Sequence, residues 1–107
     1  MKAIRADELL PGQATSVMVE GTNVALFNVD GSFHAIENRC IHRGGPLAEG
    51  FVSGPVVTCP WHEWRFDVTN GACLNAPGLQ VRTFSVSVKD GDVLVDVTGV
   101  DEPYEVA

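Results

Sequence analysis

Two short segments of this 107-residue sequence each carry one cysteine and one histidine at metal-ligand spacing. The first begins C-I-H, with Cys40 and His42, and the second reads C-P-W-H, with Cys59 and His62. Thiolate and imidazole are both good ligands for zinc and for iron. Both segments lie in stretches rich in glycine and proline, and long ordered loops in small domains usually carry function. We therefore expect these four residues to form a metal site.

Three explanations compete for this pattern. A chance grouping is disfavoured, because two of the three cysteines would each have a histidine within three residues, in loops of the same kind. A structural zinc site is the second, but such sites usually pair cysteine with cysteine and histidine with histidine, whereas each segment here is mixed. The third is an iron–sulfur centre in which two histidines replace two cysteines on one iron.

The two segments resemble the cluster-binding boxes of the Rieske iron–sulfur family, C-x-H-x-G-x-x-L and C-P-x-H-G-x-x-F. The matching residues are Cys40, His42, Gly44 and Leu47 in the first box, and Cys59, Pro60, His62 and Phe66 in the second. The resemblance implies one 2Fe–2S cluster, with Cys40 and Cys59 on one iron and His42 and His62 on the other. Glu63 departs from the pattern, since the family often has glycine there, and this puts the local backbone angle in question.

The ligand set and the cysteine count bear on the redox potential. With two thiolates instead of four, the oxidised centre is neutral and accepts an electron more easily, and such centres span about −150 to +300 mV. High-potential members of the family carry an additional cysteine in each box, and these two cysteines form a disulfide. Here Cys73 is the one cysteine left over, so we expect a potential near the low end, about −150 mV. Cys73 itself is read as a small buried core thiol.

The flanking sequence alternates apolar and polar residues, which is typical of strands. Asp30-Gly31 and Asp90-Gly91 are typical of tight hairpin turns, and one helical turn is expected at Asp7–Leu10. The pattern predicts an all-β fold, a small antiparallel sandwich or barrel with a loop-rich cluster-binding subdomain at about 38–78, in a single domain over 1–107. The expected strands are Ala14–Val19, Val24–Val29, Ser32–Glu37, Phe51–Ser53, Val56–Thr58, Val81–Lys89 and Val93–Val97.

The charge is negative and unevenly distributed. The net charge of −7 argues against nucleic acid and anionic membranes as partners. Residues 39–82 carry four basic and three acidic side chains, a net charge of +1, whereas the rest of the chain has a net charge of −8. No targeting signal and no apolar run of membrane-spanning length is visible. We therefore expect a cytoplasmic monomer whose acidic body orients its cluster end toward protein partners.

Several other residues near the boxes have a structural and a functional interpretation. Trp61 and Trp64 flank His62, where they either pack over the cluster or form a docking surface. Pro77, in N-A-P-G, resembles the proline-containing loop that covers the cluster in the family. Arg43 is the best candidate for a docking charge, and His34 is read as structural.

The resemblance implies a function as well as a fold. Small members of the family are ferredoxins that accept electrons from a flavin-dependent reductase and pass them to the terminal oxygenase of aromatic-ring hydroxylating systems. We expect such a one-electron carrier and no catalytic site, since the sequence has no G-x-G-x-x-G motif and no hydrolytic triad. One alternative is the small subunit of an assimilatory nitrite reductase. Another, of a different class, is a zinc-stabilised interaction module.

Overall fold

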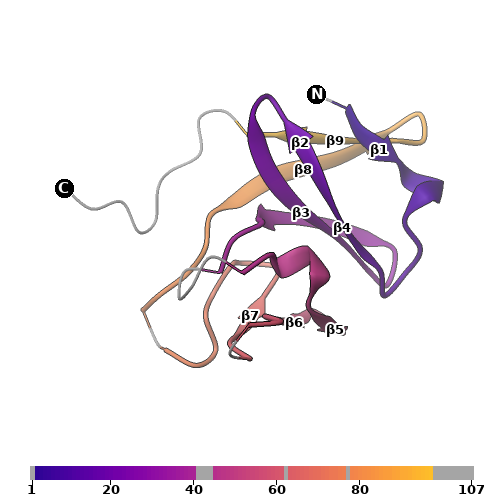
Figure 1. The fold of residues 1–107 in the computed structure, drawn as a ribbon. Coiled ribbons are helices and arrows are strands. Elements are labelled where there is room, and N and C mark those ends of the chain that lie inside the picture. The colour runs from indigo at the N-terminus through magenta and orange to yellow at the C-terminus, as the bar shows by residue number, and fades with distance from the viewer. Residues whose placement is uncertain (1, 41–44, 62, 77, 98–107) are drawn as a thin grey trace.

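The computed structural model describes residues 2–40, 45–61, 63–76 and 78–97, and these form two antiparallel sheets without an α-helix (Figure 1). Two single turns of 3-10 helix, η1 (Ala6–Glu8) and η2 (Leu47–Glu49), join strands. The predicted all-β class is confirmed. The strands are β1 (Lys2–Arg5), β2 (Ala14–Val19), β3 (Thr22–Val29), β4 (Ser32–Glu37), β5 (Phe51–Ser53), β6 (Val56–Thr58), β7 (Arg65–Asp67), β8 (Thr83–Lys89) and β9 (Asp92–Asp96).

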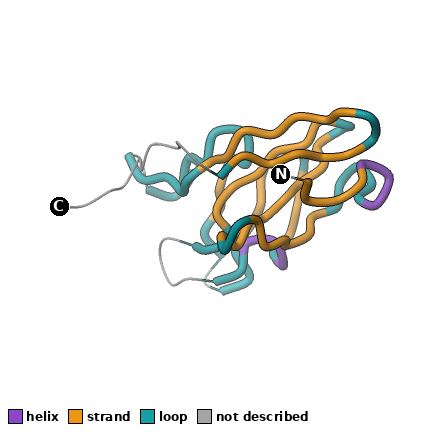
Figure 2. Tube along the Cα trace, turned by 90° about the horizontal axis from the view of Figure 1, so that it is seen from above, coloured by secondary structure: helices purple, strands orange, loops and turns teal. Residues whose placement is uncertain are grey.

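The large sheet is strongly curved. Its strand order is β1-β9-β8-β4-β3-β2, and every neighbouring pair is antiparallel. The two edge strands, β1 and β2, lie close to each other, so the sheet is nearly closed into a barrel (Figure 2). In the described part of the chain no helix is both long and apolar enough to cross a membrane.

Tight turns fix the register of three hairpins in this sheet. Each has two central residues at positive φ: Glu20-Gly21 (49° and 83°), Asp30-Gly31 (52° and 93°) and Asp90-Gly91 (54° and 80°). This combination is the type I′ turn, whose twist matches that of the flanking strands. The turns predicted at Asp30-Gly31 and Asp90-Gly91 are confirmed. The first hairpin has a shorter turn than predicted, because β3 begins at Thr22.

Other boundaries also differ from the sequence-based prediction: the strand expected at Val93–Val97 is β9, one residue earlier, and β1 and β7 were not predicted. β8 begins at Thr83 and not at Val81, because the Val81 amide donates to the Gly71 carbonyl (2.9 Å) and its side chain enters the core beneath the small sheet. The predicted helical turn at Asp7–Leu10 lies slightly earlier, as η1. There the Glu8 carboxylate accepts a hydrogen bond from the Arg5 amide (2.8 Å), which favours a single turn starting at Ala6.

The described residues form two hydrophobic cores to which β3 and β4 both contribute, β3 with two buried residues on each face and β4 with Ala35 in one core and Ile36 in the other. Val24 and Leu26 of β3 belong to a core inside the barrel, whereas Ala25 and Phe27 belong to a core between the barrel and the small sheet. Because side chains alternate across a strand, β3 is buried on both faces. This explains its nearly continuous apolar sequence. The second core also contains all three cysteines, so the small sheet and its loops are packed directly on the barrel wall.

The small sheet brings the two cysteine-containing segments together. Its order is β5-β6-β7, and the strands predicted at Phe51–Ser53 and Val56–Thr58 are confirmed as the antiparallel pair β5 and β6. Gly50 permits this close pairing, because a Cβ there would collide with the Thr58 carbonyl oxygen. The hairpin carries the chain out from η2 and back, so that Cys59 at the end of β6 returns to the level of Cys40.

Candidate metal centre

Cys40 and Cys59 meet at the junction of the two sheets. Both are free thiols, and their exposed fractions are only 2% and 1%. Cys40 follows β4 of the barrel, Cys59 follows β6 of the small sheet, and their side chains lie close enough for each thiol to affect the other. The structure therefore brings together the two predicted thiolate ligands. The two predicted histidine ligands, His42 and His62, lie outside the described residues.

The two cysteine loops are closed by the same kind of hydrogen bond. The Cys40 amide donates to the Gly45 carbonyl (2.8 Å), and the Cys59 amide donates to the Trp64 carbonyl (2.7 Å). In each loop the bond spans four intervening residues, and each span contains one of the two box histidines. Two loops of equal size thus present their thiols to each other from opposite sheets.

A glycine keeps space open beside one of these thiols. A Cβ built on Gly45 would lie 2.8 Å from the Cys59 sulfur and 3.1 Å from the Trp61 ring. Real Cβ atoms do not approach sulfur so closely, so a residue with a side chain at position 45 would displace the buried Cys59 sulfur. The sequence analysis did not single out Gly45. The sequence marks this position by a second glycine: the box motif accounts for Gly44, and Gly45 follows it directly.

The electrostatic setting of the thiols favours a bound cation. Burial raises the pKa of the Cys59 thiol; a backbone hydrogen bond from Trp61 opposes this shift, and the neighbouring Cys40 thiol reinforces it. Two buried thiols in contact resist ionising together, because two negative charges would repel each other in a poorly solvated place. A metal cation between them removes that obstacle. The donor set and the space beside it therefore fit an iron held by two thiolates.

A buried asparagine holds both ends of the first loop. Asn38 is 8% exposed. Its backbone amide donates to the backbone carbonyl of Asn23 (3.0 Å), and its side-chain Nδ2 donates to the Asn23 Oδ1 (3.2 Å). Its Oδ1 accepts from the amide of Ala48 in η2 (2.8 Å). The side chain thus connects the start of the loop, the end of the loop and β3. Sequence reasoning missed this residue, because its partners come together only in the fold.

The second loop is supported by the segment that follows β7. The Asn75 Oδ1 accepts from the Arg65 amide (2.6 Å), and the Leu74 amide donates to the Arg65 carbonyl (2.8 Å). These bonds attach residues 74–76 to the end of the second box. The segment corresponds to the predicted proline-containing loop, although Pro77 itself lies outside the described residues. Leu74 and Leu79, on either side of it, are 46% and 43% exposed.

The remaining candidate residues occupy different environments. Trp64 packs against the core that contains the cysteines, whereas Trp61 is 49% exposed. Cys73 is buried in the same core and pairs with Phe66 through a β-bridge, as expected of a structural thiol. His34 lies on β4 opposite Phe27 of β3. Arg43, the predicted docking charge, lies outside the described residues.

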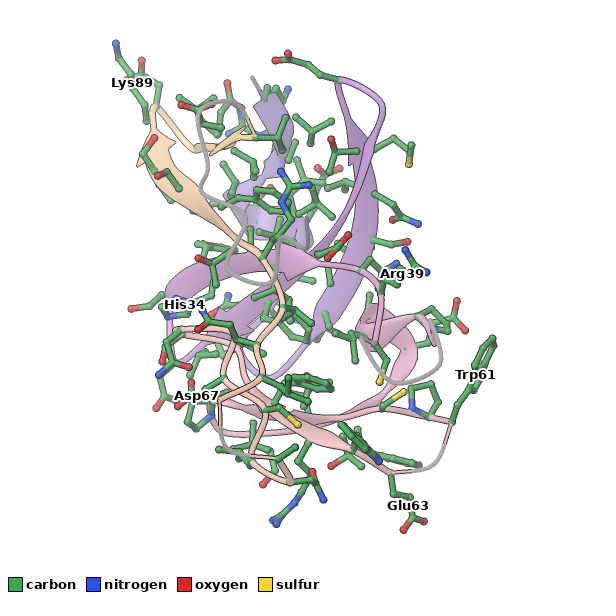
Figure 3. The ribbon with its side chains drawn as sticks, turned by 90° about the vertical axis from the view of Figure 1, so that its left-hand side faces the viewer. His34, Arg39, Trp61, Glu63, Asp67 and Lys89 are labelled. Carbon is green, nitrogen blue, oxygen red and sulfur yellow. The ribbon has the colours of Figure 1, made fainter. Side chains whose placement is uncertain are left out.

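Glu63 keeps the backbone conformation for which glycine is the usual choice. Its φ is 59°, in the left-handed region, which costs a residue with a side chain about 1–2 kcal/mol. The backbone angle at this position could not be predicted from the sequence, and the structure shows that it is the left-handed angle typical of glycine. Glu63 is exposed, and Figure 3 shows its side chain and that of Trp61 extending outward at the end of the molecule away from Lys89.

Comparisons with known proteins agree with this geometry. The sequence profile of the Rieske [2Fe-2S] domain matches residues 1–86. The ferredoxin component of the naphthalene 1,2-dioxygenase system of Pseudomonas putida is 33% identical over 99 residues, which cover 92% of this chain and 95% of that protein.

Solved structures give the same result. A chain in the complex of reduced oxygenase and oxidised ferredoxin of carbazole 1,9a-dioxygenase matches with a TM-score of 0.83 and 33% identity, over 90% of this chain and all of that one. A chain described as an NADH-dependent nitrite reductase small subunit from Mycobacterium tuberculosis matches with a TM-score of 0.82 and 31% identity, over 89% of this chain and 91% of that one.

Proposed function

The chain belongs to the Rieske [2Fe-2S] domain family, and we propose that it holds its cluster through Cys40, His42, Cys59 and His62. One iron is bound by the two cysteines and the other by the two histidines, as the box motifs of the family imply. The observation that carries this assignment is the contact between the buried Cys40 and Cys59 thiols, presented by two loops that are closed alike. The histidines fall within those loops in the sequence.

The protein is an electron-transfer component and not itself an enzyme. A bound 2Fe–2S cluster accepts and donates one electron. The two thiols are buried against the barrel, and position 45 carries no side chain that would displace the Cys59 sulfur. Hydrogen bonds of the Asn38 side chain hold the first loop in place. A braced, buried donor set changes little between redox states, which favours fast electron transfer.

Its function is to carry single electrons to a terminal oxygenase of the aromatic-ring hydroxylating type. Relatives of matching length include the ferredoxin components of dioxygenase systems, and one solved neighbour forms a complex with its oxygenase. The exposed apolar side chains Trp61, Leu74 and Leu79 lie on the second loop and on the segment that supports it. They provide an apolar contact surface beside the proposed cluster, which suits a short-lived protein complex.

Further parts of the proposal concern the cell and the other partner. We infer a flavin-dependent reductase as the electron donor, a monomeric state and a cytoplasmic location, with residues 1–107 forming one Rieske domain whose cluster portion is about 38–78. The assimilatory nitrite reductase subunit is the weaker alternative: a chain of that description has the same fold, but no feature of the described residues favours it. The zinc-stabilised module is set aside, because the matching family carries an iron–sulfur cluster.

The ligand assignment is tested by single substitutions with matched controls. We expect Cys40→Ser, Cys59→Ser, His42→Ala and His62→Ala each to abolish the red-brown colour and the bound iron of the purified protein. Cys73→Ser and His34→Ala change the other cysteine and the other histidine of the chain, and both should keep the cluster. A coloured protein after loss of any of the four proposed ligands would contradict the assignment.

A further inference from the structure

Trp61 is a side chain through which the second cysteine loop reaches the first. A Cβ built on Gly45 would lie 3.1 Å from both Cγ and Cδ2 of the Trp61 ring, so the indole lies against the α-carbon of this glycine. Gly45 is buried, and its carbonyl accepts the hydrogen bond from the Cys40 amide (2.8 Å). Trp61 therefore packs on the residue that closes the loop of the other cysteine. Figure 3 shows Trp61 on the same side of the molecule as Arg39, the residue before Cys40.

The same point on Gly45 also faces the thiol of the second loop. The built Cβ would lie 2.8 Å from the Cys59 sulfur, so the glycine α-carbon, the sulfur and the indole meet in one place. No disulfide joins the two loops, because Cys40, Cys59 and Cys73 are all free. The loops are therefore held to each other at this place by packing, and the indole is its largest contributor.

The separation of the two loops matters for both irons of the proposed cluster. One iron takes Cys40 from the first loop and Cys59 from the second, and the other iron takes one histidine from each loop. A change in the distance between the loops would therefore alter the ligand geometry of both irons. An indole seated on a glycine opposes such a change, because moving the loops apart exposes packed apolar area to water.

We propose that Trp61 is a positioning residue that holds the two cysteine loops at the separation at which both irons are ligated. The inference rests on the proposed function and adds a role for a residue outside the four proposed ligands. The Trp61 side chain is half exposed, so one part of the indole packs on Gly45 while the other part stays at the surface. The packing and docking interpretations of Trp61 thus apply to different parts of the same ring.

The test is hydrogen–deuterium exchange of the purified, cluster-loaded full chain, followed by mass spectrometry of its peptides. Trp61→Ala removes the indole, and Trp61→Phe keeps an aromatic ring that can still reach Gly45. Phe51→Ala is the matched control, because Phe51 is an exposed aromatic residue at the start of β5 in the same small sheet. The decisive signal is the Cys40 amide, which is hydrogen-bonded within the first loop while the substitution lies in the second.

We expect Trp61→Ala to speed exchange in the peptide that contains Cys40 by about tenfold or more, since opening of the loop no longer exposes a packed indole. Peptides of β3 should exchange as in the wild type. Trp61→Phe should restore most of the protection, and Phe51→Ala should leave it unchanged. The Trp61→Ala protein should also lose its colour faster in a chelator, and the electron paramagnetic resonance signal of its reduced form should broaden, because the ligands of both irons take up a wider range of positions.

Three results would overturn the inference: unchanged protection of Cys40 in Trp61→Ala, faster exchange confined to the peptide that contains Cys59, or equal acceleration in the barrel strands. If Trp61→Ala is purified without a cluster, Trp61→Leu, a smaller truncation, is compared with Phe51→Ala by the same criteria. None of these results contradicts the proposed function. That function fails in a different way, if the wild-type protein is purified without iron and acid-labile sulfide, and the exchange of the chains is measured independently of that result.

Discussion

The residues around the proposed cluster are of two kinds: residues proposed to bind the cluster, and residues whose small size avoids a clash with the thiols. Cys40 and Cys59 are proposed to be of the first kind, and their residue types and spacing led us to expect that they lie together. Gly45 is the second kind, and its importance follows from the 2.8 Å that would separate an added Cβ from the Cys59 sulfur. That distance joins two residues of different loops. The Gly44-Gly45 pair marks the position in the sequence, but the contact with Cys59 and its consequence come from the structure.

Gly45→Ala should therefore prevent stable cluster binding. The added methyl group overlaps the Cys59 sulfur and the Trp61 ring, and relieving such overlaps in a packed site costs about 1–3 kcal/mol. We expect the variant to be purified with far less iron and acid-labile sulfide per chain than the wild type. Gly54→Ala adds a methyl group where no atom lies within 4 Å. Its φ of 56° makes the substitution strained, but in the β5–β6 turn and not beside the thiols, so the variant should keep a full cluster. Full iron content in Gly45→Ala would refute this role.

The raised pKa of Cys59 predicts how cluster assembly depends on pH. Burial, reinforced by Cys40, keeps the thiol protonated to higher pH than usual, and only the thiolate binds iron. The proton therefore competes with iron up to a higher pH, and assembly on the apoprotein from iron and sulfide should speed up between pH 7 and pH 9. The growth of visible absorbance measures the rate, with Cys73→Ser as a control of unchanged profile. A rate that is flat or falls over this range would be inconsistent with the assignment.

At the scale of elements, the strands of the small sheet and the two loops act as a frame for the thiols. The strands Phe51–Ser53 and Val56–Thr58 were predictable, because short apolar runs are bounded there by glycine and proline. The start of β8 was placed too early, at Val81, which is apolar but out of phase with Phe84, Val86 and Val88. Its backbone amide donates to the Gly71 carbonyl instead. The role of Asn38 was also hidden, since Asn23 and Ala48 lie far from it in sequence. Long-range hydrogen bonds decide both cases.

The hydrogen bonds of the Asn38 side chain predict a larger loss of stability in one variant than in another. Asn38→Ala leaves the partly buried Ala48 amide and the Asn23 side chain without their partner, which should lower the free energy of unfolding by about 1 kcal/mol. Asn38→Asp keeps the acceptor for Ala48 and loses the donor to Asn23, so its effect should be smaller. Urea unfolding of the cluster-loaded proteins measures both. Equal stability of Asn38→Ala and the wild type would show that these hydrogen bonds do not stabilise the loop.

At the scale of the whole molecule, two cores are joined through β3 and, with one buried residue in each core, through β4. Inspection of the sequence identified β3 as a strand but assigned it no special position, because a continuous apolar run does not reveal which neighbours cover each face. The structure shows Leu26 facing the barrel interior and Phe27 facing the cysteines. Packing of the cluster loops and packing of the barrel therefore depend on the same backbone.

Adjacent substitutions on this strand should separate the two cores. Leu26→Ala and Phe27→Ala both remove fully buried side chains, and each should cost about 2–5 kcal/mol of stability. Phe27→Ala opens the core that holds Cys40 and Cys59, so it should also hasten cluster loss in the folded protein, measured as bleaching in the presence of a chelator. Leu26→Ala serves as the control. Faster bleaching in Leu26→Ala than in Phe27→Ala would contradict the division.

The central claim, that this chain carries one Rieske cluster with mixed cysteine and histidine ligation, is tested most directly by electron paramagnetic resonance of the dithionite-reduced protein. One unpaired electron per chain is expected, with the low average g value that distinguishes the mixed ligand set from a cluster held by four cysteines. A signal of the four-cysteine type, or a colourless protein that contains zinc and gives no signal, would contradict it.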